Sequence, residues 1–303
     1  MQTSAGMAAG GETRAEQGQE RPPELDAWLN RHLYHPLARR LARAAVGTPV
    51  SPNALSVAGG ALVAAAAILY TELSWPLSVL LGFAAHALWH VLDGADGMLA
   101  RMTGTASPTG ELVDGAADYL SHLFLYTWLG FWLADRIGWW GYALGLAAGL
   151  SRIVQANHAE TQRRIYLWRV CRVPWLRQAQ AGGDSLFRDR GLFARLAAPA
   201  ARGYVAMAGA LNALSAEVDT AMDRHQDRAR AVALCRAASR GPLRMQAWLG
   251  ANPRTVALGL SMALGTPLWF FLFEATLLNL LLVVSVMRQR ASDRRLAAEL
   301  AAG

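Results

Sequence analysis

The sequence has no lysine and only two cysteines among its 303 residues. All 29 basic residues are therefore arginines, whose planar and permanently charged guanidinium groups suit phosphate binding. The cysteines, Cys171 and Cys235, do not have a metal-ligand spacing, which leaves a disulfide framework or a zinc site without support. A reduced, cytosol-facing setting fits them best.

Charge is scarce as well, because charged residues make up 17% of the chain and hydrophobic residues 53%. This composition is too apolar for an ordinary soluble protein and too polar for membrane helices alone, so we expect both parts. The many aromatic residues exclude disorder along the whole chain. Residues 1–23 lack the apolar core of a secretory signal and are predicted to be a disordered tail.

Long runs without charge predict an all-α, polytopic membrane protein with six transmembrane helices. Four of these helices fall in residues 50–156 and two in residues 251–290. The runs are Ala54–Tyr70, Ser74–Leu92, Tyr119–Ala134, Ile137–Leu150 and Thr255–Met287, the last interrupted only by Glu274. The last run is long enough for two spans, and its turn falls either at Gly265-Thr266-Pro267, which puts Glu274 inside the membrane, or at Glu274 itself.

Arginine-rich segments flank these runs. Residues 24–46 combine apolar residues at helical spacing with arginines, which predicts an amphipathic helix lying on an anionic membrane surface; a helix packed on a soluble core is the alternative. Residues 157–250 hold 15 arginines against seven acids and are predicted to be a helical cytoplasmic insertion, with helical spacing over Leu167–Leu176 and Leu192–Leu214. Residues 291–303 form a cytoplasmic tail.

Six spans place all of these basic segments on one side, which the positive-inside rule makes cytoplasmic. Basic charge alone is also typical of nucleic-acid binding, but the chain carries no nucleic-acid motif. Membrane phospholipids are therefore the expected anionic partners, and no nucleic acid is expected. The bacterial-looking composition favours an inner (cytoplasmic) membrane with the termini facing the cytoplasm.

Four aspartates lie at the cytoplasmic ends of the second and third predicted spans. Asp93 and Asp96 are three residues apart and Asp114 and Asp118 are four apart, so each pair occupies one helical face. Two antiparallel helices would direct all four carboxylates at one place. Hard oxygen ligands of this kind favour Mg²⁺ or Mn²⁺, and we expect two ions. A single aspartate in such a position is more often a solvated helix-end acid.

Small residues surround the aspartates and leave room for a diphosphate and a sugar to approach the helix backbone. Arg101 is suited to clamp a phosphate. The small residues are Gly94, Gly97, Ala100, Gly110 and Gly115.

The aspartates belong to a longer pattern, which reads Asp93-x2-Asp96-Gly97-x2-Ala100-Arg101-x8-Gly110-x3-Asp114-x3-Asp118. It resembles, without departure, the signature of the CDP-alcohol phosphotransferase family of integral-membrane phospholipid synthases. Upstream, Pro52-Asn53-Ala54-Leu55-Ser56 is similar to the family's Pro-Asn-x-x-Thr, with Ser56 keeping the hydroxyl. The likeness covers Val50–Asn157 and, in span layout only, Arg254–Arg290; it leaves out the insertion.

The resemblance implies a six-helix, usually dimeric enzyme that holds a CDP-linked donor with two divalent ions. It makes Asp93, Asp96 and Asp114 metal ligands, and Asp118 a ligand or the general base. An alcohol oxygen would attack the phosphorus distal to cytidine, and CMP would leave. The expected CDP-binding residues are Pro52, Asn53, Ser56, Gly97, Ala100, Arg101 and Gly110.

Two donors remain open. CDP-diacylglycerol would react with a small polar alcohol such as glycerol phosphate, inositol, inositol phosphate or serine, or a CDP-aminoalcohol would react with diacylglycerol. The compact six-span layout favours the first. The alternative from another functional class is a non-catalytic membrane scaffold, in which a divalent ion bound by the aspartates has a structural role only. The acceptor alcohol, the preferred metal and the role of the insertion stay open.

Other residues have two interpretations. Arg152 resembles the basic position that some relatives use to hold an acidic acceptor, or is a snorkelling arginine at the end of a span. Gly141, Gly145 and Gly149 predict close helix packing, with a second subunit or a neighbouring span as the partner. His86 and His90 are more often buried, hydrogen-bonded histidines than metal ligands.

Overall fold

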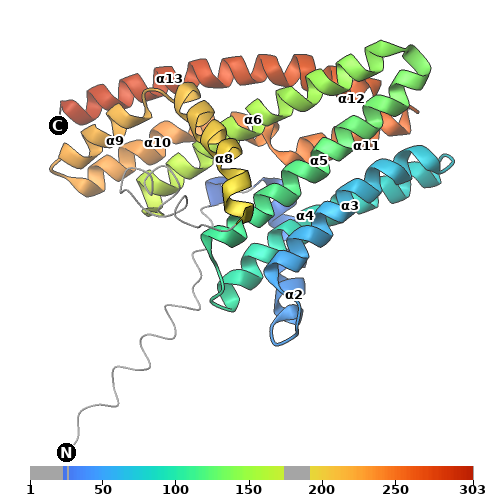
Figure 1. The fold of residues 1–303 in the computed structure, drawn as a ribbon. Coiled ribbons are helices and arrows are strands. Elements are labelled where there is room, and N and C mark those ends of the chain that lie inside the picture. The colour runs from blue at the N-terminus through green and yellow to red at the C-terminus, as the bar shows by residue number, and fades with distance from the viewer. Residues whose placement is uncertain (1–22, 26, 174–191, 303) are drawn as a thin grey trace, which may run out of the picture.

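The computed structural model describes residues 23–25, 27–173 and 192–302, and this part of the chain consists of helices and turns without a strand (Figure 1). The all-α prediction is confirmed. Residues 1–22 of the predicted disordered tail lie outside the described residues, as does the end of the Leu167–Leu176 segment beyond residue 173.

Three helical hairpins organise the chain. The first pairs α3 (Pro52–Glu72) with α4 (Leu77–Met102), and the second pairs α5 (Pro108–Ile137) with α6 (Trp139–Cys171). The third joins α11 (Ala251–Ala263) to one long helical rod near the C-terminus. That rod consists of α12 (Leu268–Leu272), the π-helical turn η4 (Phe273–Leu277) and α13 (Leu278–Ala301).

The last hairpin turns at Gly265, whose φ of +80° lies in the left-handed region that favours glycine. The first of the two predicted turn positions is therefore confirmed. Glu274 does not form a turn; it lies within η4, and its side chain is completely buried.

Three helical segments of the described chain are long and apolar enough to cross a membrane: Pro52–Glu72, Leu77–Met102 and Leu268–Ala301. These segments indicate a membrane protein. The helices α5, α6 and α11 correspond to the other expected spans but fall short of this criterion. For α11 the reason is length, since its 13 residues span about 20 Å against a hydrocarbon core of about 30 Å. The count of six spans stays a prediction.

The glycine face of α6 packs against α5. A side-chain carbon built on Gly145 would lie 3.0 Å from Cα of Gly130, and one on Gly149 would lie 3.6 Å from Cβ of Tyr126. Close packing is thus confirmed, and within the chain the partner of this face is the neighbouring helix α5.

The predicted amphipathic segment includes the π-helical turn η2 (Asn30–Tyr34) and α2 (His35–Ala45), after a short 3-10 turn, η1 (Pro23–Leu25). Its small face, with Ala38 and Ala42, packs against Val91 and Ala95 of α4. On its outer side Trp28 is exposed. An apolar outer surface of this kind is compatible with the predicted contact with lipid, which stays a prediction.

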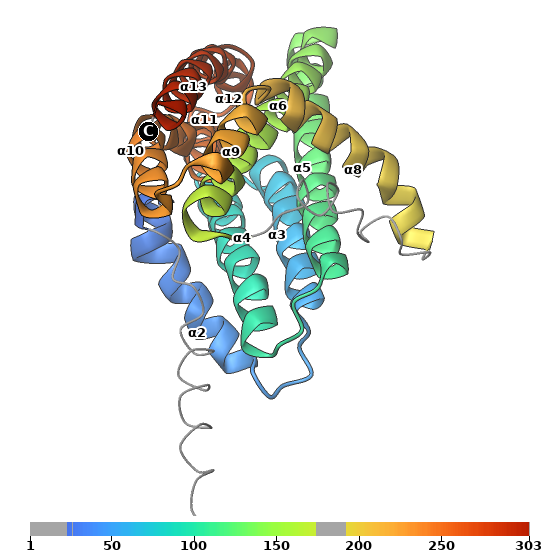
Figure 2. The ribbon, with the colours of Figure 1, turned by 90° about the vertical axis from the view of Figure 1, so that its left-hand side faces the viewer.

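The insertion contributes α8 (Leu192–Leu211), α9 (Ser215–Arg224) and α10 (Arg228–Gln246), followed by the 3-10 turn η3 (Ala247–Leu249). Helices α6 and α13 pass through the predicted boundaries at residues 157 and 291 without interruption and pack with α9 and α10. Figure 1 shows α9, α10 and the end of α13 at one end of the molecule, and Figure 2 shows α8 pointing away from them. Arg169 of α6 joins the group by binding Asp219 at 2.8 Å and Asp293 at 3.1 Å.

Candidate active site

Two serine-proline sequences begin the helices that carry the predicted site. Ser51 caps α3 by accepting the N–H of Ala54, and Ser107 caps α5 by accepting the N–H of Gly110, each at 3.1 Å. Proline follows each serine, at the first helical position, where its missing N–H costs nothing. These two first turns hold the predicted CDP-binding residues Pro52, Asn53 and Gly110.

The two first turns also lie side by side. A side-chain carbon on Gly110 would lie 3.3 Å from Oγ of Ser107 and 3.7 Å from Oδ1 of Asn53. Any larger residue at Gly110 would therefore fill the space beside Asn53. The structure brings together two predicted CDP-binding residues that are far apart in the sequence.

Asp96 is held by hydrogen bonds from a side chain and from the backbone. It is buried, and Oγ of Ser56 donates a hydrogen bond of 2.6 Å to its Oδ2. The backbone N–H of Gly97 donates to its Oδ1. Its carboxyl group also interacts electrostatically with that of Asp114 on α5. Ser56 thus orients a predicted metal ligand.

Arg101 folds back along α4 towards the same aspartate. A side-chain carbon on Gly97 would lie 3.3 Å from its Nη1, so only glycine leaves the guanidinium in this place without displacement. Arg101 interacts electrostatically with Asp96. Ala100, one residue before it, accepts the Thr105 N–H at 2.9 Å through its carbonyl and helps to end the helix.

Asp118 faces basic partners as well as the other acids. Its Oδ1 lies 2.9 Å from Nδ1 of His122, which also hydrogen-bonds the Asp118 carbonyl at 2.8 Å. Its Oδ2 lies 3.7 Å from Nη2 of Arg152 on α6. Arg152 is only 11% exposed, which argues against the snorkelling interpretation and places this residue beside the predicted catalytic aspartate.

The four aspartates supply the oxygen ligands that a divalent ion prefers, but they are not arranged as a complete metal site. Asp93, Asp96 and Asp118 all act electrostatically on Asp114, and four acids so close together favour a cation. Among the described residues, however, no three histidine, cysteine, aspartate or glutamate side chains are arranged to hold an ion. Part of the reason is that the Asp118 carboxylate is directed to His122 and Arg152.

Three histidines of this region were not predicted from the sequence to be metal ligands. His86 and His90 are buried and lie 3.4 Å and 2.9 Å from the hydroxyl oxygen of Thr255 on α11, which supports the interpretation as hydrogen-bonded core residues. His122 was missed altogether. Its spacing of four from Asp118 places it on the same helical face as Asp114 and Asp118, so this spacing is a signal that could have found it.

Further charged side chains lie on α6, on the helical turns that follow Arg152. Glu160 pairs with Arg163 at 2.6 Å and Arg164 at 2.5 Å, and Arg164 also lies 3.8 Å from Glu111 in the first turn of α5. Burial opposes ionisation of Glu160, but the two arginines outweigh it and lower its pKa to about 2. This ionic group joins the extension of α6 to the beginning of α5.

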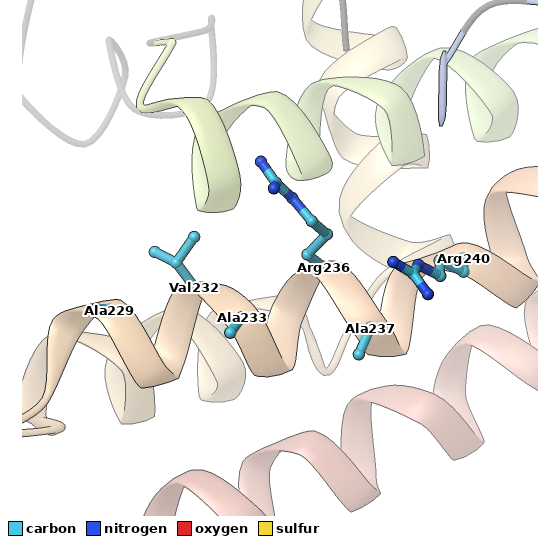
Figure 3. A pocket seen from close by; sticks show the side chains of 6 residues that line it. All are labelled: Ala229, Val232, Ala233, Arg236, Ala237 and Arg240. Atoms are coloured by element: carbon cyan, nitrogen blue, oxygen red, sulfur yellow. The ribbon is translucent and has the colours of Figure 1, made fainter. Parts of the chain in front are cut away.

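A cavity of about 380 Å³ lies elsewhere, along one face of α10 (Figure 3). It is lined by small apolar residues together with Arg236 and Arg240. None of the predicted site residues lines it, and it contains no acid that could bind a metal. It is therefore not the site of the predicted chemistry.

Residues 49–178 match the family model described as CDP-alcohol phosphatidyltransferase. The chain contains a CDP-alcohol phosphatidyltransferase domain. This family consists of phosphotransferase enzymes, and its members generally depend on a divalent metal. The matched residues hold the complete aspartate pattern, Pro52 to Ser56 and Arg152, and leave out most of the insertion and the last hairpin. No curated protein matches the chain.

Replacing Ser56 by alanine tests the role of its hydroxyl in this domain. Asp96 would lose its buried donor, so we expect the concentration of Mn²⁺ needed for half-maximal activity to rise by roughly 10-fold or more. Threonine at this position keeps the hydroxyl and should stay within about 2-fold of wild type. The measurement is a metal titration of initial rates. An unchanged titration for the alanine variant would contradict the assignment.

Proposed function

We propose that this protein transfers a substituted phosphate group from a CDP-linked donor, CDP-diacylglycerol in the first instance, to the hydroxyl group of an alcohol, with release of CMP. The single observation that carries the proposal is the family match over residues 49–178, which contains every position of the aspartate pattern. The enzyme family favours transfer over a non-catalytic scaffold.

The donor would lie where α3, α4 and α5 meet. Asn53 and Gly110 lie beside one another there, and the Arg101 guanidinium near Asp96 is suited to a diphosphate oxygen. Pro52, Ser56, Gly97 and Ala100 complete the proposed CDP-binding set. Small residues at Gly97 and Gly110 leave space for the nucleotide against the helix backbone.

Asp93, Asp96, Asp114 and Asp118 are the proposed holders of two divalent ions, Mg²⁺ or Mn²⁺. Bound there, the ions would neutralise the charge of the diphosphate. The residues themselves fix the geometry: Ser56 and the Gly97 amide hold Asp96, and His122 and Arg152 hold Asp118. Binding of an ion by all four requires Asp118 to turn from its basic partners.

The transfer forms one bond from the acceptor oxygen to the phosphorus distal to cytidine and breaks the bond from that phosphorus to the bridging oxygen, which leaves with CMP. The hydroxyl proton goes to Asp118 or to water. A carboxylate stabilised by a neighbouring arginine and histidine is a weak base. Positioning of the acceptor is therefore an equal part of the proposed role of Asp118.

Arg152 is the proposed acceptor-binding residue. Its guanidinium lies 3.7 Å from the Asp118 carboxylate, where it can reach an oxygen of an acceptor next to Asp118. This position favours a polar or acidic alcohol as the acceptor, and hence CDP-diacylglycerol as the donor. A CDP-aminoalcohol with diacylglycerol as acceptor is the second candidate, favoured by the shared aspartate pattern alone.

Six membrane spans, a cytoplasmic active site in the bacterial inner membrane and a homodimer complete the proposal. Exposed tryptophans at the three hairpin turns support the topology, because tryptophan concentrates at membrane interfaces. Trp75 lies between α3 and α4, Trp139 and Trp140 follow the α5–α6 turn, and Trp269 follows the α11–α12 turn. In Figure 1 these turns lie at one end of the bundle, away from the insertion.

The proposal is tested by CMP release from purified protein in detergent with Mg²⁺ or Mn²⁺. CDP-diacylglycerol is offered with glycerol phosphate, inositol, inositol phosphate or serine, and CDP-choline or CDP-ethanolamine is offered with diacylglycerol. We expect metal-dependent CMP release with one CDP-diacylglycerol pair. CMP release only with a CDP-aminoalcohol would make that compound the donor and diacylglycerol the acceptor. Absence of CMP release with every pair, from protein that is folded and binds metal, would contradict the proposed reaction.

A further inference from the structure

A buried polar network lies next to the candidate active site. Its centre is Glu274, whose Oε1 accepts hydrogen bonds from Nε of Arg254 at 2.8 Å and from the Tyr126 hydroxyl at 2.9 Å. Nη2 of Arg254 in turn donates to Oε1 of Gln155 at 2.6 Å. None of these four side chains is more than 3% exposed. The network joins α5, α6, α11 and η4.

Stability alone does not account for such a network. Burying two charges costs several kcal/mol per ion in desolvation, and a well-packed apolar pair often serves as well or better. Within an apolar hairpin, an apolar contact would therefore hold α11 against η4 at a lower desolvation free energy than the Arg254–Glu274 pair does. Glu274 also lies in a π-helical turn, a distortion that is frequent at functional sites.

The network fixes α6 on both sides of Arg152. Nε2 of Gln155 donates to the Glu274 carbonyl at 3.0 Å and to Oδ1 of Asn279 at 2.8 Å. The Asn279 amide then donates to Oγ of Ser151 at 2.8 Å. Ser151 and Gln155 are four residues apart on the helical turn that carries Arg152. These bonds set the rotation and height of that turn relative to η4 and α13.

The charge of the Glu274 carboxylate also acts on Arg152 through space, without a contact between the two side chains. Its second oxygen, Oε2, is buried without a hydrogen-bond partner among the described residues. Arg152 forms its ion pair with Asp118, and the more distant Glu274 adds a second electrostatic attraction. The charge of Glu274 therefore contributes to how closely Arg152 approaches Asp118, now 3.7 Å away.

We propose that Glu274 is a positioning residue for the transfer reaction: through Tyr126, Gln155 and the π-helical turn it holds Arg152 at the distance from Asp118 that the acceptor requires. This inference rests on the proposed function. It assigns the last hairpin, which lies outside the matched family region, a part in the chemistry of the first four helices. It also requires the donor site at the first turns of α3 and α5 to be independent of Glu274.

The test is a double variant, Glu274→Gln with Arg254→Gln, which removes the buried pair without leaving one charge alone. We expect kcat for CMP release to fall about 10- to 100-fold, as for other residues that orient a catalytic group, while KM for the CDP-linked donor stays within about 2-fold. Tyr126→Phe removes one hydrogen bond to Glu274 and keeps the ring; kcat should fall roughly 3- to 10-fold.

The matched control is Arg169→Gln with Asp219→Asn and Asp293→Asn, which removes a buried arginine together with both of its aspartate partners in the group formed by α6, α9 and α13. Its kcat per folded molecule should equal that of wild type. Folding is checked for each variant by a cooperative thermal transition and a monodisperse elution profile, and donor binding by calorimetry with CDP and Mn²⁺.

Wild-type kcat in the folded Glu274→Gln/Arg254→Gln and Tyr126→Phe proteins would overturn the positioning role and leave the proposed function intact. A rise in the donor KM or a loss of CDP binding parallel to the loss of kcat would also overturn it, since the effect would then be structural. Absence of CMP release from the wild-type protein would overturn the proposed function, and this inference with it.

Discussion

Replacing Asp93 or Asp118 by asparagine is expected to lower CMP release at least about 100-fold while the protein stays folded. Asparagine keeps the size of the side chain and removes its charge, so it takes away one anionic ligand without opening a cavity. Asp93 is exposed on α4, and Asp118 is partly exposed on α5, so neither change disrupts the core. The measurement is the initial rate of CMP release at saturating donor and metal.

The matched control is Asp135→Asn, which makes the same change on α5 at the opposite end of the helix. Asp135 is exposed and belongs to no proposed site, so its variant should release CMP at the wild-type rate. Full activity of either Asp93→Asn or Asp118→Asn would contradict the roles assigned to these residues. Full activity of Asp118→Asn alone would remove the general-base role and leave positioning to Arg152.

Replacing Gly141 by alanine is expected to destabilise the protein by about 1–3 kcal/mol, the usual cost of overfilling a packed interface. A side-chain carbon on Gly141 would lie 2.3 Å from the backbone nitrogen of Ala134 and 2.6 Å from its Cα. Both obstacles are backbone atoms, which cannot rotate away, so the α5–α6 hairpin must open. Because Arg152 on α6 meets Asp118 on α5, CMP release should fall as well.

The control on the same helical face is Gly149→Ala, where the added carbon would meet Cβ of Tyr126 at 3.6 Å, an ordinary van der Waals distance. Thermal unfolding in detergent, followed by tryptophan fluorescence, measures both variants. Equal midpoints for Gly141→Ala and wild type would show that α5 and α6 are not packed as closely as the structure describes. A destabilised Gly149→Ala together with a stable Gly141→Ala would place the tight contact elsewhere.

The sequence predicted the helical elements because their signals are local. Charge-free runs marked the helices of the bundle, Gly265 marked the last turn, and the spacing over Leu192–Leu214 marked α8, which ends at Leu211. The spacing of Asp93, Asp96, Asp114 and Asp118 predicted the candidate site. Each of these signals lies within a single helix or turn, so it can be detected without knowing which helices pack together.

The partners of buried polar side chains could not be predicted in the same way. Glu274 was one acid in an apolar run, and nothing near it indicated that Tyr126, 148 residues earlier, or Arg254 would bind it. Its alternative role as a turn residue was excluded only by the helix that contains it. Similarly, Asp118 was expected to face the other aspartates, whereas the structure also places it against His122 and Arg152.

By itself, then, the sequence determined that this chain is a helical membrane protein with a CDP-alcohol phosphatidyltransferase pattern, since hydropathy and residue spacing act within single helices. Tertiary structure decided which helices meet, and so which charges pair: Ser56 with Asp96, Arg152 with Asp118 and Arg254 with Glu274. The physical reason is that a buried polar group must find a partner wherever packing brings one. Residue spacing can mark a face that packs closely, as Gly141, Gly145 and Gly149 do, but it does not name the partner of a buried charge.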